Sequence, residues 1–218
     1  MQTPYDKLAA GIRACTVCSF RDAEFTPLAP AQVTLPVAVM FIGENPSWEL
    51  GQGVPFDEAT ISGRSLETNF LQPLGLKRSE VWVTNLFKCR YPRDVTHNKQ
   101  RQEHRVQGEV VAACKRWLGE EIRLARPKVV VSLSDRQVFR RLRTAYALAT
   151  PARFARAVGR PHPVEFGSIP VILFPMVHPD VARPPGEGDA RKPGPREKWA
   201  SVHCQEHLPA LARLLEGL

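Results

Sequence analysis

The chain has 218 residues, 43% of them hydrophobic, and no Ser/Gly-rich linker divides it, which predicts one compact α/β domain over residues 1–218. A formal net charge of +8 and a pI of about 9.6 favour a polyanionic partner. No run approaches the ~18 apolar residues of a membrane span, and residues 1–7 have no signal-peptide core, so we expect neither a membrane protein nor a secreted one.

The first motif in the chain is Cys15-x-x-Cys18. Disulfides are rare in a reducing compartment, so this pair indicates a redox motif, part of a metal site or a chance spacing. Together with Cys89 and Cys114 it could close a four-thiolate site for zinc or for an iron–sulfur cluster. Alternatively, Cys89 and Cys114 are ordinary small core residues, which is also our interpretation of Cys204.

The apolar run at residues 37–42 predicts a buried strand that ends in the loop Gly43–Ser47. Open α/β sheets bind their ligands at the carboxyl ends of strands. The loop that carries Glu44 and Asn45 is therefore the predicted active site. Taken alone, a glycine and a proline after a strand are often only a turn.

Three more apolar runs, at residues 81–85, 129–134 and 169–174, predict three further strands. Asn85 and Ser134 end two of these runs, and His178-Pro179-Asp180 follows the third. In one sheet, Glu44, Asn85, Ser134 and His178 would lie along a single edge.

Two segments concentrate the positive charge of the chain. Residues 136–160 contain seven arginines and no Asp or Glu, and residues 88–116 contain eight Lys or Arg against three acidic residues. A single such segment is as compatible with a solvated helix face as with a phosphate-binding surface. The presence of two favours nucleic acid as the partner.

Several short motifs occur in an order that is typical of one family. They are Cys15 and Cys18, Gly43–Pro46, Gly53–Phe56, Thr84-Asn85, Lys88-Cys89, Cys114 on a predicted helix at residues 110–118, and His178-Pro179. In these motifs the chain resembles the uracil-DNA glycosylase superfamily, and most closely its iron–sulfur branch, formed by family 4 and the cross-linking UdgX group. The resemblance extends from about Cys15 to the last helix.

The resemblance implies a three-layer αβα fold with a four-stranded parallel sheet. It implies a 4Fe-4S cluster held by Cys15, Cys18, Cys89 and Cys114 that serves structure and DNA docking. The partner would be uracil-containing DNA, single- or double-stranded, from which a base is flipped into a pocket. The protein would act as a monomer in the bacterial or archaeal cytosol, associated with the nucleoid through its function.

The same resemblance implies a role for each site residue. Glu44 or Asn45 would position the attacking water, and His178 would stabilise the negative charge that develops on the leaving base. No lysine is placed for Schiff-base chemistry. The activity would be that of a monofunctional glycosylase in base excision repair, which excises a deaminated base, uracil first, with hypoxanthine and xanthine as further candidates.

Four residues would bind the substrate. The Asn85 amide would contact the Watson–Crick edge of uracil, because it offers both a donor and an acceptor. Phe56 would stack on the flipped base beside Gly43, and Arg183 would fill the gap in the duplex or hold a phosphate. Three of the site residues have a plain alternative: Phe56 as a core residue, Asn85 as a turn cap and His178 as a loop histidine.

The chain departs from the family-4 pattern at three places. Asn45 and Ser47 replace Ala and Gly in the first loop, and Asp180 replaces a Ser after His-Pro. An asparagine at position 45 is the water-holding device of other branches, so the loop carries two candidate water holders. The charge of Asp180 near a phosphate is unfavourable unless it caps a helix or pairs with Arg183.

The segment between Cys89 and Cys114 has 24 residues and approaches the length of the UdgX insertion. In the UdgX group a histidine of that insertion is captured covalently by the sugar. His104, or His97, could play this part, with Glu103 or Glu44 orienting the ring. This is the alternative function: a catalytically weak or covalently trapping iron–sulfur protein that senses damaged or single-stranded DNA.

Overall fold

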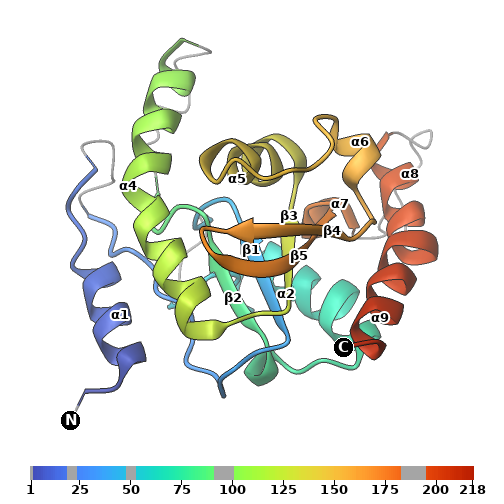
Figure 1. The fold of residues 1–218 in the computed structure, drawn as a ribbon, viewed down its shortest axis with the longest axis horizontal. Helices are drawn as coiled ribbons and strands as arrows, with labels where there is room; N and C mark the ends of the chain where they lie inside the picture. The colour runs from blue at the N-terminus through green and yellow to red at the C-terminus, as the bar shows by residue number, and fades with distance from the viewer. Residues whose placement is uncertain (1, 19–23, 48–52, 91–100, 183–194) are drawn as a thin grey trace.

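The computed structural model describes residues 2–18, 24–47, 53–90, 101–182 and 195–218 (Figure 1). Five strands form one sheet in the order β2-β1-β3-β5-β4. They are β1 (Val39–Gly43), β2 (Trp82–Asn85), β3 (Val129–Leu133), β4 (His162–Phe166) and β5 (Ile169–Met176). All neighbours pair in parallel except β4, which is antiparallel to β5. The four predicted parallel strands are confirmed, and a fifth strand extends the sheet.

The additional strand β4 lies at an edge of the sheet. Buried Val164 and Phe166 alternate with exposed neighbours, as in a strand that is covered on one face. A two-residue turn, Gly167-Ser168, with Gly167 at φ 68°, connects it to β5. Both features are sequence signals of a hairpin, although the strand is too polar to stand out as an apolar run.

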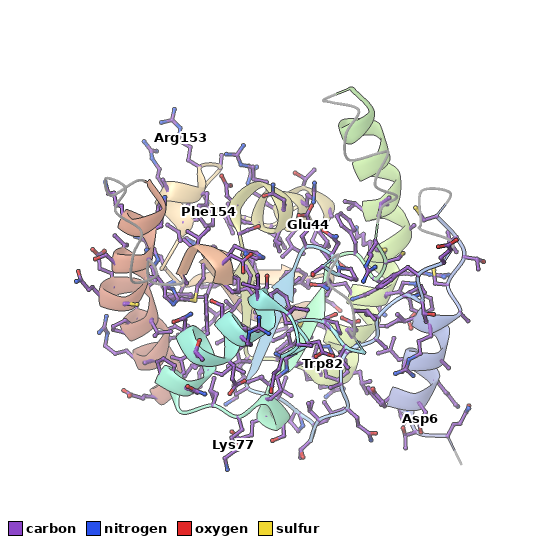
Figure 2. All side chains as sticks on the ribbon, turned by 180° about the vertical axis from the view of Figure 1, so that it is seen from behind. Asp6, Glu44, Lys77, Trp82, Arg153 and Phe154 are labelled. Carbon is purple, nitrogen blue, oxygen red and sulfur yellow. The ribbon has the colours of Figure 1, made fainter. Side chains whose placement is uncertain are left out.

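Helices cover both faces of the sheet (Figures 1 and 2). The α-helices are α1 (Pro4–Arg13), α2 (Ile61–Leu66), α4 (Arg101–Ala125), α5 (Arg140–Ala145), α6 (Phe154–Ala157), α7 (Pro179–Ala182), α8 (Pro195–Val202) and α9 (Leu208–Glu216). Short 3-10 turns are η2 (Gln72–Leu74) and η3 (Arg78–Glu80), and single π-helical turns are η1 (Glu67–Leu71), η4 (Asp135–Phe139) and η5 (His203–His207). The αβα class is confirmed. In the described part of the chain, no helix has the length and apolarity needed to cross a membrane.

The three inner strands carry the core and position the site. Every residue of β1, β2 and β3 is buried, as expected for parallel strands covered on both faces. Gly43 and Asn85 are register partners at the carboxyl ends of β1 and β2. Pairing continues past the strands, because Leu86 N donates to Gly43 O and Phe87 N to Glu44 O, each at 2.8 Å. The two loops that follow these strands are therefore fixed to each other.

Candidate active site

A cavity of about 170 Å³ opens at the carboxyl ends of β1 and β2. It contains five of the predicted site residues. Its lining consists of Glu44, Asn45, Pro46, Ser47, Phe56, Thr60, Ser62, Asn85 and His178. The structure thus brings together residues from four separate segments of the chain, as the strand-end argument predicted for Glu44, Asn85 and His178.

Phe56 forms one wall of the cavity and is held there by its backbone. Its φ of 54° lies in the left-handed region, which is strained for an aromatic residue. The Arg78 guanidinium donates to the carbonyls of Pro55 and Phe56, at 2.5 and 3.0 Å. Gly43 lies directly behind, where a Cβ would overlap the Phe56 ring and come within 2.6 Å of Asn85 Oδ1. Glycine is therefore required at position 43 for this wall to form.

Asn85 lines the cavity with an unsatisfied acceptor. The residue is 2% exposed, and its Oδ1 has no hydrogen-bond partner among the described residues. A buried carbonyl oxygen without a partner carries a desolvation cost of about 1–3 kcal/mol. A ligand that donates a hydrogen bond to this oxygen would remove that cost.

Glu44 is paired with a cation from another element, the helix α5. Arg141 Nη1, on α5, lies 2.5 Å from Glu44 Oε1 and also donates to Gln137 O at 3.0 Å. The guanidinium sits over the Phe87 ring, 5.1 Å from its centroid. Both partners are largely buried, with 13% of the Arg141 side chain and 27% of the Glu44 side chain exposed. Arg141 therefore fixes the position of the carboxylate.

Asn45 has a different partner. Its Nδ2 donates to Pro46 O at 2.9 Å, which fixes the amide within its own loop. The two candidate water holders therefore lie side by side in the cavity wall, and only Glu44 is ion-paired to a side chain from another element.

His178 is oriented by the residues that follow it. Asp180 N donates to His178 Nδ1 at 3.2 Å, so the neutral ring carries its proton on Nε2. Asp180 Oδ1 accepts from Ser62 Oγ at 2.9 Å, and Pro179 O accepts from Ser65 Oγ at 2.6 Å. These bonds join the first turn of α7 to α2. Asp180 therefore has an evident structural role here, as the residue that connects His178 to α2.

A second groove of about 1060 Å³ adjoins the cavity and shares Glu44 and His178 with it. Arg140 and Arg153 line it, but so do Asp135 and Asp180, and Arg140 is bonded to Asp135 at 2.9 and 3.1 Å. Figure 2 shows Arg153 and Glu44 on the same upper side of the molecule. The arginine-rich segment thus reaches the site, although two of its charges are neutralised by carboxylates.

Ser134, predicted at the same edge, lines this groove instead of the cavity. It has a φ of 117°, and its Oγ is buried without a partner among the described residues. Strained backbone of this kind concentrates at ligand sites.

The four predicted cysteine ligands come from three segments of the chain. Cys89 and Cys114 are buried, and Cys15 and Cys18 are half-buried. Burial raises the pKa of the Cys114 thiol, and the nearby Cys15 and Cys18 raise it further, so these three sulfurs lie within electrostatic reach of one another. Among the described residues, however, no three His, Cys, Asp or Glu side chains are arranged to hold a metal ion. Cys204, expected in the core, is exposed on η5.

A buried ion pair connects the cysteine region to the cavity. Lys88 Nζ lies 2.7 Å from Glu121 Oε1 on α4, and both side chains are at most 1% exposed. The same ammonium donates to Thr84 Oγ1 at 2.8 Å and to Asn85 O at 2.7 Å. Lys88 therefore holds the end of β2 against the helix that carries Cys114.

Three of the predicted site residues have side chains outside the described part of the chain, and three residues that support the site were not predicted. Arg183 and His97 lie outside the described residues, and of His104 only its place in α4 is described. Arg141, Ser62 and Glu121 were not predicted as site or supporting residues. Arg141 stood out only as part of a basic segment, and nothing in the sequence pairs Ser62 with Asp180, because 118 positions separate them.

Comparisons with known proteins agree with this arrangement. A family model described as the uracil DNA glycosylase superfamily matches residues 30–185. Type-4 uracil-DNA glycosylases of Sulfurisphaera tokodaii and Saccharolobus solfataricus are each 27% identical over 181 residues, which is 81% of this chain and 74% and 76% of theirs. That of Thermotoga maritima is 30% identical over 125 residues, 56% of this chain and 57% of its own. Since the family model covers well over half of the sequence, the chain belongs to the uracil-DNA glycosylase superfamily.

Proposed function

We propose that the protein is a monofunctional DNA glycosylase that hydrolyses the N-glycosidic bond of uracil in DNA, the opening step of base excision repair. One observation carries the proposal: a carboxylate, an amide, an imidazole and an aromatic ring line one small cavity at the strand ends. The type-4 uracil-DNA glycosylases that the chain matches over most of its length support it.

The size of the cavity favours a pyrimidine. An apolar cavity of about 150 Å³ is known to hold benzene, a single six-membered ring. The cavity of about 170 Å³ is thus suited to uracil rather than to the fused rings of hypoxanthine or xanthine. To enter it, the base must first leave the helical stack, as in other enzymes that act on bases.

Asn85 and Phe56 would recognise the base. The unpartnered Asn85 Oδ1 is suited to accept from uracil N3–H, while its amide nitrogen donates to O4. Cytosine has no hydrogen on N3 and carries an amino donor at C4, so the same amide fits it poorly. Phe56, whose ring lies 6.3 Å from the His178 ring, offers a face for stacking.

Glu44 and His178 would carry the chemistry. A water attacks the sugar C1′ as the C1′–N1 bond breaks, and the bonding pair leaves with the base. His178, with its proton on Nε2, donates to O2 of the departing uracil, where negative charge develops. Glu44, held by Arg141, accepts the proton from the water. The products are uracil and an abasic site. No lysine is found among the described lining residues, in keeping with hydrolysis rather than Schiff-base chemistry.

We also propose that Cys15, Cys18, Cys89 and Cys114 hold a 4Fe-4S cluster. The donor set fits, because Cys-x-x-Cys and two single cysteines supply four thiols, and Cys114 interacts with both members of the pair. When bound, such a cluster contributes structure, since it joins the N-terminal segment to α4 and to the end of β2.

Iron and sulfide analysis of anaerobically purified protein tests the cluster. Cys114→Ser should lose iron and the thiolate-to-iron charge-transfer absorption. Cys204→Ser, at an exposed cysteine, is the matched control and should retain both. Iron-free wild-type protein would refute this assignment without affecting the glycosylase proposal.

Labelled oligonucleotides with one uracil, one hypoxanthine or one cytosine at the same position test the activity. We expect alkali-dependent cleavage at uracil in the wild type, and none in His178→Ala. Asn85→Asp should lose selectivity against cytosine, because the amide donor to O4 is gone. An inactive wild type, or an unchanged preference in Asn85→Asp, would contradict the proposed roles.

The covalent-trapping alternative depended on His104 or His97, and the side chains of both lie outside the described residues. Nothing else in the site favours it. The same assay distinguishes it, since a trap would leave an SDS-resistant protein–DNA band in place of free abasic product.

A further inference from the structure

A separate cleft of about 1110 Å³ lies at the other end of the sheet. Its walls are the C-terminal half of α4, the end of α5 and the turn between β4 and β5, which Figure 1 shows beside one another. It shares no lining residue with the cavity of about 170 Å³ that contains Asn85, which we call the base cavity, or with the groove that adjoins that cavity. Residues 126–128, which lead into β3, are part of it, whereas the base cavity lies where the parallel strands end.

The charge of this cleft has one sign. Five exposed cations line it, and no Asp or Glu does; they are Lys115, Arg116, Arg123, Arg126 and Lys128. We call this surface the basic cleft. Within the part of the chain that the structure describes, no ion pair joins any of the five to a carboxylate side chain, in contrast to Lys88, Arg140 and Arg141. The groove of about 1060 Å³ beside the base cavity, by comparison, is lined by arginines together with Glu44, Asp135 and Asp180.

The cations on α4 are spaced along the length of the cleft. From Lys115 to Arg123 the helix advances by about 12 Å, at 1.5 Å per residue. With one phosphate of each strand per ~3.4 Å of the DNA helix axis, this row is as long as about three to four phosphates. Two small residues, Ala112 and Gly119, line the same wall.

Two further features mark the basic cleft. Lys115 Nζ lies 5.0 Å from the centroid of the Tyr146 ring, which places an aromatic face among the cations. Arg126 and Ala147 both have φ in the left-handed region, at 46° and 51°. Two strained residues at one surface indicate a backbone shape that the surrounding structure maintains at a cost.

We propose that the basic cleft binds the phosphodiester backbone of a second DNA segment while the base cavity holds the first. This inference extends the proposed function. Because the two surfaces lie at opposite ends of the strands and share no residue, both can be occupied at once. The protein would then bridge two duplexes and could pass from one to the other without release into solvent.

Bridging of two uracil-free duplexes, one carrying a donor and the other an acceptor dye, tests the proposal by energy transfer. The variant is Arg123→Glu/Arg126→Glu, and the control is Lys77→Glu/Arg213→Glu, which makes the same charge change at exposed sites outside the basic cleft. We expect the wild type and the control to bridge. The variant should bridge at least ~10-fold less, with a salt slope of binding reduced by about two. Its excision from a short single-stranded oligonucleotide should remain at the wild-type rate.

Equal loss of bridging in variant and control, or no bridging by the wild type, would overturn the proposal. Tight binding of poly-glutamate that displaces the duplexes from the cleft would do so as well, and would assign the surface to an acidic protein. If the charge-reversed variant fails to fold, Arg123→Gln/Arg126→Asn makes the same test. A wild type that bridges but does not excise would refute the glycosylase and leave the cleft assignment intact.

Discussion

Two cation–carboxylate pairs flank the base cavity, and they differ in burial. Lys88 and Glu121 are both almost fully buried beneath Asn85, whereas Arg141 and Glu44 remain partly exposed at the cavity itself. A pair withdrawn from water matters chiefly to folding, because each charge depends on the other for solvation. A pair that stays in contact with the cavity can act on a substrate. The two pairs have similar N–O distances, 2.7 and 2.5 Å, but we expect them to have different roles.

The largest effect should come from breaking the buried pair. Lys88→Met leaves the Glu121 carboxylate without its cation and should lower the free energy of unfolding by about 3–5 kcal/mol. The double variant Lys88→Met/Glu121→Leu should recover most of that loss, since no buried charge remains. Urea unfolding of the three proteins measures both effects. A double variant less stable than the single one would show that the pair is not a unit.

Glu44→Gln keeps the shape of the Glu44 side chain and removes the negative charge from its pair with Arg141. We expect kcat for uracil to fall about 10²–10⁴-fold, the range of a lost general base, with unfolding little changed. Asn45→Ala, in the same loop, should reduce kcat much less, because Arg141 holds Glu44 and not Asn45. Equal, near-native rates in both variants would remove this loop from the mechanism.

A smaller effect is expected for the partner of Glu44. Arg141→Gln should lower kcat about tenfold, because the carboxylate loses the side chain that holds it in position. Arg141→Lys should restore part of the rate. A kcat in Arg141→Gln equal to that of the wild type would show that Arg141 contributes only packing on Phe87.

Low pH is expected to lower the stability through a third region, which contains the buried histidines His203 and His207. Burial lowers the pKa of His203 and of His207 below the ordinary 6.5, and His203 lowers that of His207 further. Below pH 6.5 the unfolded chain therefore binds protons that the folded protein resists, so stability falls as the pH drops. The slope is at most about 1.4 kcal/mol per pH unit for each histidine. Unfolding of His203→Gln/His207→Gln across pH 5–7 should be flatter than that of the wild type.

The sequence predicts features that depend on neighbouring residues, such as strands, better than contacts between residues far apart in the chain. The apolar runs that end at Gly43 and Asn85 predict parallel strands. Together with the family motifs, they indicate five of the residues that line the cavity. Strand β4 was not predicted, because its alternation of buried and exposed residues is short and its sequence is polar. The contacts of Arg141 with Glu44 and of Ser62 with Asp180 join residues 97 and 118 positions apart, and only tertiary packing brings such residues together.

The connection through Lys88 limits how this protein can change during evolution. One ammonium contacts the backbone of Asn85, the residue proposed to read the base, and a carboxylate on the helix that carries Cys114. We therefore expect a substitution of Lys88 to affect both the position of Asn85 and the packing of α4. We expect homologues with an apolar residue at position 88 to have lost the acid at 121 as well, and designers who wish to retune base selectivity should leave both in place.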